Sequence, residues 1–151
     1  MTLFACSAAP EPKRQPWSAY IYPGFSEKIN ALSGGDSIDC GFDDWVNTQN
    51  GKPFKNNQIM SIACAKDALS RNESFKLAIV TIPLDSYLYE ILVYSKDKEL
   101  WLISIDVMLD KSDSSMSLKK CANIKFTEAT FSGIGCKHMP IGDWVAEKMS
   151  P

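Results

Sequence analysis

The clearest regular pattern of apolar residues lies between Asn57 and Arg71. At 100° per residue, one arc of this segment holds Ile59, Ile62, Ala65 and Leu69. A second, smaller apolar stripe holds Met60, Cys64 and Ala68. Asn56 and Asn57 are both suitable N-cap residues. The pattern therefore predicts one main helix that contacts the rest of the protein on two sides.

Beyond this helix the apolar residues recur with a period of two, which is typical of strands. The segment 75–82 is rich in apolar and β-branched residues, and Pro83 ends it. The segments 87–95 and 100–109 predict two further strands. In the first of them, one face carries Tyr87, Tyr89, Ile91 and Val93. Short connections between these strands favour antiparallel pairing.

The remaining segments indicate shorter elements, by their glycines, capping residues or polarity. We expect a strand at 17–22, a loop at 33–36, the start of a helix at 42–46, a polar loop at 110–118, a fourth strand at 122–131 and a final helical turn at 142–149. Together the elements predict an α+β fold, in which one main helix packs on an antiparallel meander of about four strands.

The length and composition fit a single domain. The chain has 151 residues, of which 45% are apolar and 23% are charged, as in an ordinary soluble globular protein. Residues 7–16 contain three prolines and no large apolar side chain, which predicts an extended tether. We therefore divide the chain into residues 1–16, a terminal segment and tether, and residues 17–151, one globular domain.

The five cysteines separate into four and one. Cys40, Cys64, Cys121 and Cys136 are spread through the domain, whereas Cys6 precedes the tether. None forms the close pair that a zinc site needs. Four well-spaced cysteines favour two disulfides and an oxidising compartment, although four buried thiols are an alternative. We favour the pairs 40–64 and 121–136, because Cys40 lies before the main helix and Cys64 within it, and because the second pair closes a modest loop around the fourth strand. The two other pairings stay open.

The residues around Cys6 read Leu3-Phe4-Ala5-Cys6-Ser7 and resemble the bacterial lipobox, which ends in a lipidated cysteine. The resemblance implies that Cys6 carries a lipid, and Ser7 after it implies sorting to the outer membrane. No apolar run reaches the length of a membrane-spanning helix, so the lipid is the one expected membrane contact. We therefore expect a periplasmic lipoprotein.

The charge balance argues against a nucleic-acid partner. Sixteen basic residues against eighteen acidic ones give a net charge of -2. A nucleic-acid binder normally shows a basic excess or stripe, so we expect no nucleic-acid partner.

Candidates for catalysis are sparse. His138 is the one histidine, and it lies two residues after Cys136. A Cys–His hydrolase would need a free thiol and an orienting third group, so we interpret His138 as an exposed loop residue. Asp106 stands inside an apolar strand and is a candidate for a binding site. We expect neither an enzyme nor a cofactor or metal.

Amphipathic aromatic residues point to a protein partner, because tyrosine and tryptophan are favoured at interfaces. The candidate contact residues are Tyr87, Tyr89, Trp101 and Asp106, and we expect the three aromatic ones on an exposed sheet face. The sequence thus indicates an exported binding module, and by analogy an immunity protein that inhibits a secreted toxin enzyme. The alternatives are a small cell-envelope hydrolase, using Asp106 or His138, and a structural envelope protein.

Overall fold

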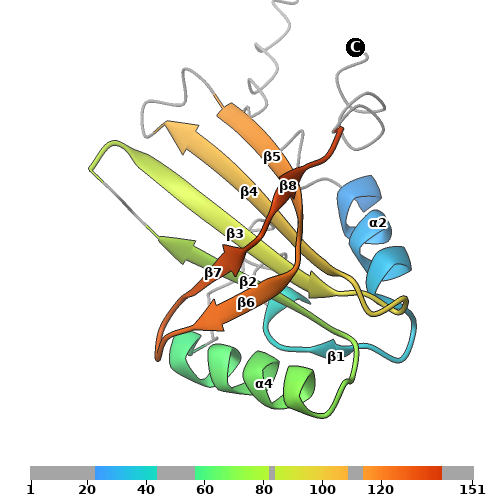
Figure 1. Cartoon of the computed structure of the whole chain (residues 1–151). Coiled ribbons are helices and arrows are strands. Elements are labelled where there is room, and N and C mark those ends of the chain that lie inside the picture. The colour runs from blue at the N-terminus through green and yellow to red at the C-terminus, as the bar shows by residue number, and fades with distance from the viewer. Residues whose placement is uncertain (1–22, 44–56, 82–83, 109–113, 141–151) are drawn as a thin grey trace, which may run out of the picture.

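The computed structural model describes residues 23–43, 57–81, 84–108 and 114–140 (Figure 1). Three of our expectations lie outside these residues: the lipidated Cys6, the strand at 17–22 and the final turn at 142–149. Of the expected helix at 42–46, only Phe42 and Asp43 are described, and both are helical.

A six-stranded mixed sheet forms the centre of the domain, with strand order β1-β2-β3-β4-β5-β8. All neighbours are antiparallel except β1, which pairs in parallel with β2. The α+β class is confirmed, but the sheet has more strands than predicted. The strands are β1 (Ile38–Asp39), β2 (Phe75–Thr81), β3 (Ser86–Tyr94), β4 (Leu100–Met108), β5 (Ser114–Cys121) and β8 (Lys137–His138).

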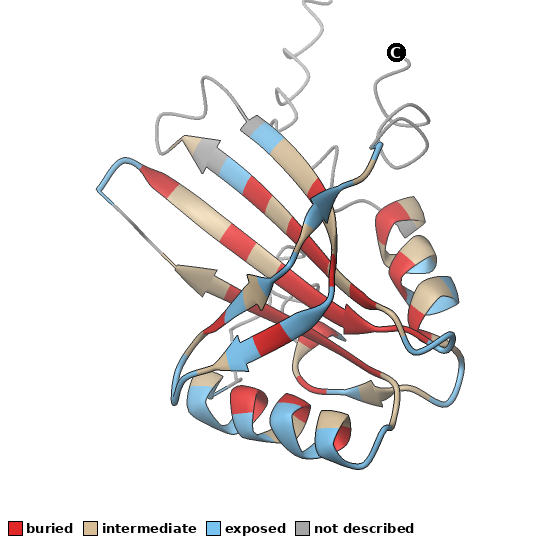
Figure 2. Cartoon of the chain, viewed as in Figure 1, coloured by how far each residue is buried: buried red, intermediate tan, exposed pale blue. Residues whose placement is uncertain are grey.

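The two faces of the sheet have different covers (Figure 1). Helix α2 (Pro23–Ser33) packs on one, here called the α2 face, which receives the odd-numbered residues of β3 and β4. Helix α4 (Gln58–Ser70) and the hairpin of β6 (Asn123–Phe126) and β7 (Phe131–Ile134) cover the other, the α4 face. Buried residues follow the central strands and the inner sides of both helices (Figure 2). The sheet therefore has two cores, one on each face.

Helix α4 forms where its periodicity predicted it. The Asn57 side chain accepts a hydrogen bond from the Ile59 amide at 3.0 Å, which caps the first turn. The buried residues of the helix are Ser61, Ile62, Ala65 and Ala68. These mostly small side chains let the helix lie close to the sheet, whereas Ile59 lies outside this buried side and is 48% exposed. The prediction that Ile59 belongs to the inner arc is wrong.

Helix α2 was not predicted. It begins at Pro23, a residue that suits the first turn because it has no amide hydrogen to satisfy. It ends before Gly34, whose φ of +94° is a left-handed conformation that glycine adopts readily. Phe25 and Ile29 are both fully buried against the sheet. The helix therefore covers a face that the sequence led us to expect exposed.

The prediction is also wrong after β4. Residues 114–118 belong to strand β5 rather than to a loop, and the expected fourth strand at 122–131 is the hairpin β6–β7. In β5, Met116 and Leu118 face the α2 face, while serines alternate with them. Alternation of serine with apolar residues is compatible with a half-buried strand. The polar composition of the segment, however, is also typical of a loop.

Candidate functional site

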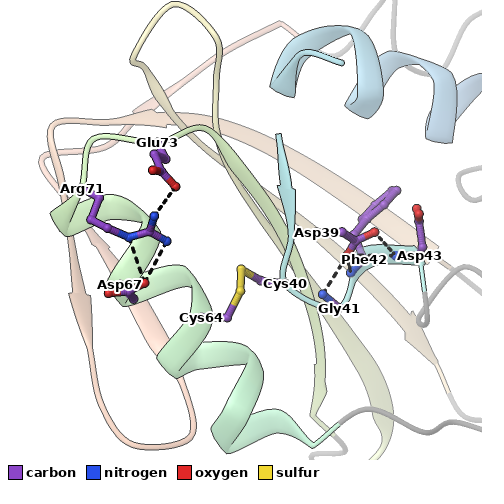
Figure 3. The surroundings of a disulfide bond; sticks show 9 residues. All are labelled: Asp39, Cys40, Gly41, Phe42, Asp43, Cys64, Asp67, Arg71 and Glu73. Carbon is purple, nitrogen blue, oxygen red and sulfur yellow. Dashed lines mark hydrogen bonds and ion pairs between the residues drawn. A yellow bond between two sulfur atoms is a disulfide. The ribbon is translucent and has the colours of Figure 1, made fainter. Parts of the chain in front are cut away.

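Both predicted disulfides are confirmed. Cys40, directly after β1, bonds to Cys64 in α4, with 5.6 Å between their Cα atoms. Cys121 at the end of β5 bonds to Cys136 just before β8. The first bond ties a helix to an edge strand (Figure 3). The second closes the segment that contains the β6–β7 hairpin.

An open pocket of about 360 Å³ lies beside the first disulfide. Its walls come from the turn that follows β1 and from the first half of α4. The residues that line it are Asp39, Cys40, Gly41, Asp43, Met60, Ser61 and Cys64. Met60 is 70% exposed, so an apolar side chain stands at the rim of a partly acidic pocket.

Asp39 organises one wall of this pocket. Its carboxylate accepts hydrogen bonds from the amides of Gly41 and Phe42, both at 2.8 Å, and from the amide of Asp43 at 3.1 Å (Figure 3). The φ of Gly41 is +117°, which lets the chain turn back toward the carboxylate. Asp39 therefore caps the helical residues that begin at Phe42.

Lys76 lies beneath the same wall, and its side chain is only 9% exposed. Its ammonium group donates to Asn30 Oδ1 at 2.6 Å and to Asp43 Oδ1 at 3.1 Å, and lies 3.6 Å from Asp39 Oδ2. The Phe42 ring centroid is 5.2 Å from the same nitrogen. A buried lysine needs such partners, because desolvation penalises its charge. The cluster thus joins α2, β2 and the turn after β1.

Burial raises the pKa of Asp39 above its ordinary value, and the neighbouring carboxyl group of Asp43 raises it further. The amide of Gly41 and the charge of Lys76 act in the opposite direction. The polar groups of the pocket therefore interact mainly with one another, which is typical of a structural network. Within the described ranges, no group of three histidine, cysteine or acidic residues is placed to hold a metal ion.

The predicted contact residues Tyr87 and Tyr89 lie on the α2 face. Their rings stack, with 6.4 Å between the centroids. Tyr89 is only 8% exposed and belongs to the core, whereas Tyr87 is partly buried at its margin. The expectation that these residues share an exposed face is therefore wrong at Tyr89, because α2 and the packing around it cover that part of the sheet.

Trp101 and Asp106 lie apart from the tyrosines. Trp101 is on the α2 face but pairs with Val93, four residues along β3 from Tyr89. Lys120 Nζ lies 4.9 Å from the tryptophan ring centroid. Asp106 is exposed, and the alternation of β4 directs it to the α4 face. The structure therefore does not bring the four predicted contact residues together.

A polar part of the α4 face was not predicted. It lies on β3, β4 and β5, beyond the apolar contacts of α4 and the hairpin, and it holds Glu90, Ser104, Asp106, Ser117 and Lys119. Burial raises the pKa of Glu90, and the charge of Lys119 opposes this. The sequence did contain a pattern that indicates this polar area, since these residues occupy alternate positions between the apolar residues of the α2 face.

His138 and Asp106, the two candidates for catalysis, are separate. His138 is exposed in β8 and pairs with Lys119 of β5, whereas Asp106 pairs with Ser115. These two positions are four residues apart along β5, which is about 13 Å along the strand. Neither residue lines the pocket at the first disulfide.

No family model, curated protein or solved structure matches this chain. Neither of the helices described above is long and apolar enough to cross a membrane.

Proposed function

We propose that the chain is an exported protein-binding module, held at the membrane by a lipid on Cys6. The observation that carries the proposal is the use of the cysteines: two disulfides take four of them and leave Cys6 apart. Structural disulfides are typical of oxidising compartments. The lipobox-like residues around Cys6 support the periplasm as that compartment and the outer membrane as the site of anchoring.

Binding is better supported than catalysis. The acidic groups at the pocket are engaged with Lys76 and with backbone amides, so they hold the fold around the first disulfide. Asp106 and His138 are four β5 residues apart in register, which is too far for one to activate the other. By analogy with small, disulfide-stapled, lipid-anchored immunity proteins, the proposed partner is a secreted toxin enzyme.

The experiment combines localisation with protection. Wild-type protein, expressed in bacteria with an export signal, should fractionate with the outer membrane, and Cys6→Ser protein should stay soluble in the periplasm. Cells that make the wild type should survive a toxin enzyme encoded beside the gene, if that enzyme is the partner. Cells in which the wild type fractionates with the cytoplasm, or in which it is soluble regardless of Cys6, would contradict the proposal.

A further inference from the structure

Part of the α4 face carries polar side chains that the fold leaves without partners. Glu90, Ser104 and Ser117 form one row across β3, β4 and β5, because each pairs with the next in the ladder. Asp106 lies on one side of this row, and Lys119 lies on the other. No hydrogen bond or ion pair joins any of these five side chains to another described residue. These five residues are here called the polar face.

The polar face is accessible to solvent. Helix α4 and the β6–β7 hairpin lie over one end of the strands, and β3, β4 and β5 extend beyond them (Figure 1). Asp106 is exposed, and the other four residues of the polar face are partly exposed. Leu88, which pairs with Asp106, is also partly exposed and belongs to neither of the two cores. A partner can therefore contact both polar and apolar groups on this surface.

The pocket at the first disulfide shows the opposite arrangement. There the Asp39 carboxylate accepts backbone amides, and Lys76 lies beside three polar side chains. On the polar face, burial raises the pKa of Glu90, and the charge of Lys119 opposes this without forming an ion pair. A polar group that loses water without gaining a hydrogen bond costs stability. Such a cost is typical of surfaces that are kept for binding.

The charges of the polar face are divided between its two ends. Asp106 pairs with Ser115 at one end, whereas Lys119 pairs with Leu102 at the other. His138 pairs directly with Lys119, so both basic side chains lie at the same end. A cationic group is therefore attracted toward Asp106 and Glu90 and repelled from Lys119.

We infer that the polar face is a docking surface for an arginine side chain of the protein partner, which lies between Glu90 and Asp106. These two residues are diagonal neighbours in the ladder, so their Cα atoms are about 7–8 Å apart. A planar guanidinium group has five donors and can reach two carboxylates at once, whereas the ammonium group of lysine is a compact point charge. Leu88 is placed to contact the methylene groups of the arginine. This inference rests on the proposed function, because it specifies the surface and the chemistry by which the partner binds.

The test uses the 15N-labelled protein and three short peptides that differ in one side chain. Each peptide is capped at both ends and carries arginine, lysine or citrulline between two alanines. The arginine peptide should shift the amide signals of Glu90, Ser104 and Asp106 in a saturable way. The lysine peptide should bind more weakly, and the citrulline peptide, which has nearly the shape of arginine but no charge, should not bind. Shifts confined to residues 39–43 would place the cation at the pocket and overturn the inference.

Two variants test the carboxylates. Glu90→Gln and Asp106→Asn should each weaken binding of the arginine peptide about fivefold, as expected for the loss of one exposed charge pair. Glu27→Gln makes the same change on an exposed position of α2, and should leave binding unchanged. Equal binding of the arginine and citrulline peptides, no binding of any peptide, or no effect of either variant would overturn the docking surface.

The melting temperature separates a docking role from a structural one. Because the Glu90 carboxylate is half-buried and has no described hydrogen-bond partner, Glu90→Gln should keep or raise the melting temperature while it weakens binding. A lower melting temperature would show that Glu90 supports the fold, and would overturn its role in docking. Export and lipidation do not depend on these results, so fractionation of the wild type with the outer membrane still tests the proposed function by itself.

Discussion

The two disulfides are expected to contribute similarly to the free energy of unfolding, but they lie in different surroundings. They span 24 and 15 residues, so chain entropy alone gives each about 3 kcal/mol and nearly the same value. Cys40–Cys64 secures β1, a two-residue strand, beside the pocket that Asp39 and Asp43 line. Cys121–Cys136 secures a hairpin that contributes Ile124 and Phe131 to the core of the α4 face.

The two surroundings differ in the interactions that act beside each disulfide. Near Cys40, Ile38 of β1 packs against the core of the α4 face, and the backbone bonds from Ile38 to Ser74 and from Cys40 to Lys76 are supplemented by charges. Near Cys121 the packing is so close that position 133 has no room for a Cβ and is occupied by Gly133. Both disulfides thus adjoin the core of the α4 face, but the first also lies beside an electrostatic network and the second beside a closely packed glycine.

Removal of either disulfide should have the largest effect. Cys40→Ala with Cys64→Ala, and Cys121→Ala with Cys136→Ala, should each lower the free energy of unfolding by about 3 kcal/mol. Hydrogen exchange should rise at residues 38–43 in the first double variant and at residues 123–134 in the second. Urea denaturation measures the energies. Loosening of the same residues in both variants would contradict the division into two regions.

Gly133→Ala tests the tightly packed region. An added Cβ would lie 2.2 Å from Cys136 Sγ and 2.6 Å from Cys121 Sγ, so the disulfide or the hairpin must move. We expect a loss of about 2 kcal/mol, which is typical of overpacking. Gly35→Ala is the matched control, because a Cβ there meets nothing within 4 Å and should leave the melting temperature nearly unchanged. Equal effects of the two substitutions would show that the hairpin is loosely packed.

Lys76→Met tests the electrostatic region. The substitution keeps the apolar stem but removes the donor to Asn30 and the cation beside Asp39 and Asp43. We expect a loss of about 1–2 kcal/mol, since hydrogen bonds to charged groups contribute roughly this much and the Asp43 side chain is 65% exposed.

The control for Lys76 is Arg71→Met. It breaks two exposed ion pairs at the end of α4, to Asp67 and Glu73, and should cost less than about 1 kcal/mol. Thermal denaturation of the two variants gives the comparison. A smaller effect for Lys76 than for Arg71 would mean that the buried cluster does not hold β1.

The pH dependence of Asp39 should give the smallest effect. Because its pKa is raised in the folded state, the folded protein binds its proton more tightly than the unfolded chain does. The contribution of Asp39 to the stability should therefore fall as the pH rises from the ordinary value of 3.8 through the raised pKa. Asp39→Asn removes this titration, so its stability should depend less on pH in that window. Urea denaturation between pH 4 and 7 tests this, and parallel curves would contradict it.

Sequence patterns predicted the elements whose partners are close along the chain. Helix α4 and the strands β2, β3 and β4 follow from periodicity, because each buries a regular set of side chains. The pairing of β1 with β2 is parallel and two residues long, and only the packing of the whole domain creates it. Strand β5 was missed because Ser114, Ser115 and Ser117 give its first half the polarity of a loop.

The candidate contact surface was harder to predict, because the exposure of a sheet face depends on which other elements cover it. Alternation correctly placed Tyr87, Tyr89 and Trp101 on one face of the sheet. Their exposure depended on α2, which no pattern in the sequence indicated, so Tyr89 was expected at the surface although it is buried.

The most direct test of the account is disulfide mapping of the exported, full-length protein by mass spectrometry under non-reducing conditions. We predict two linked peptide pairs, Cys40 with Cys64 and Cys121 with Cys136, and a lipid on Cys6. Four free thiols after export, or a disulfide that includes Cys6, would contradict the central claim that this is an exported domain held by two local bonds.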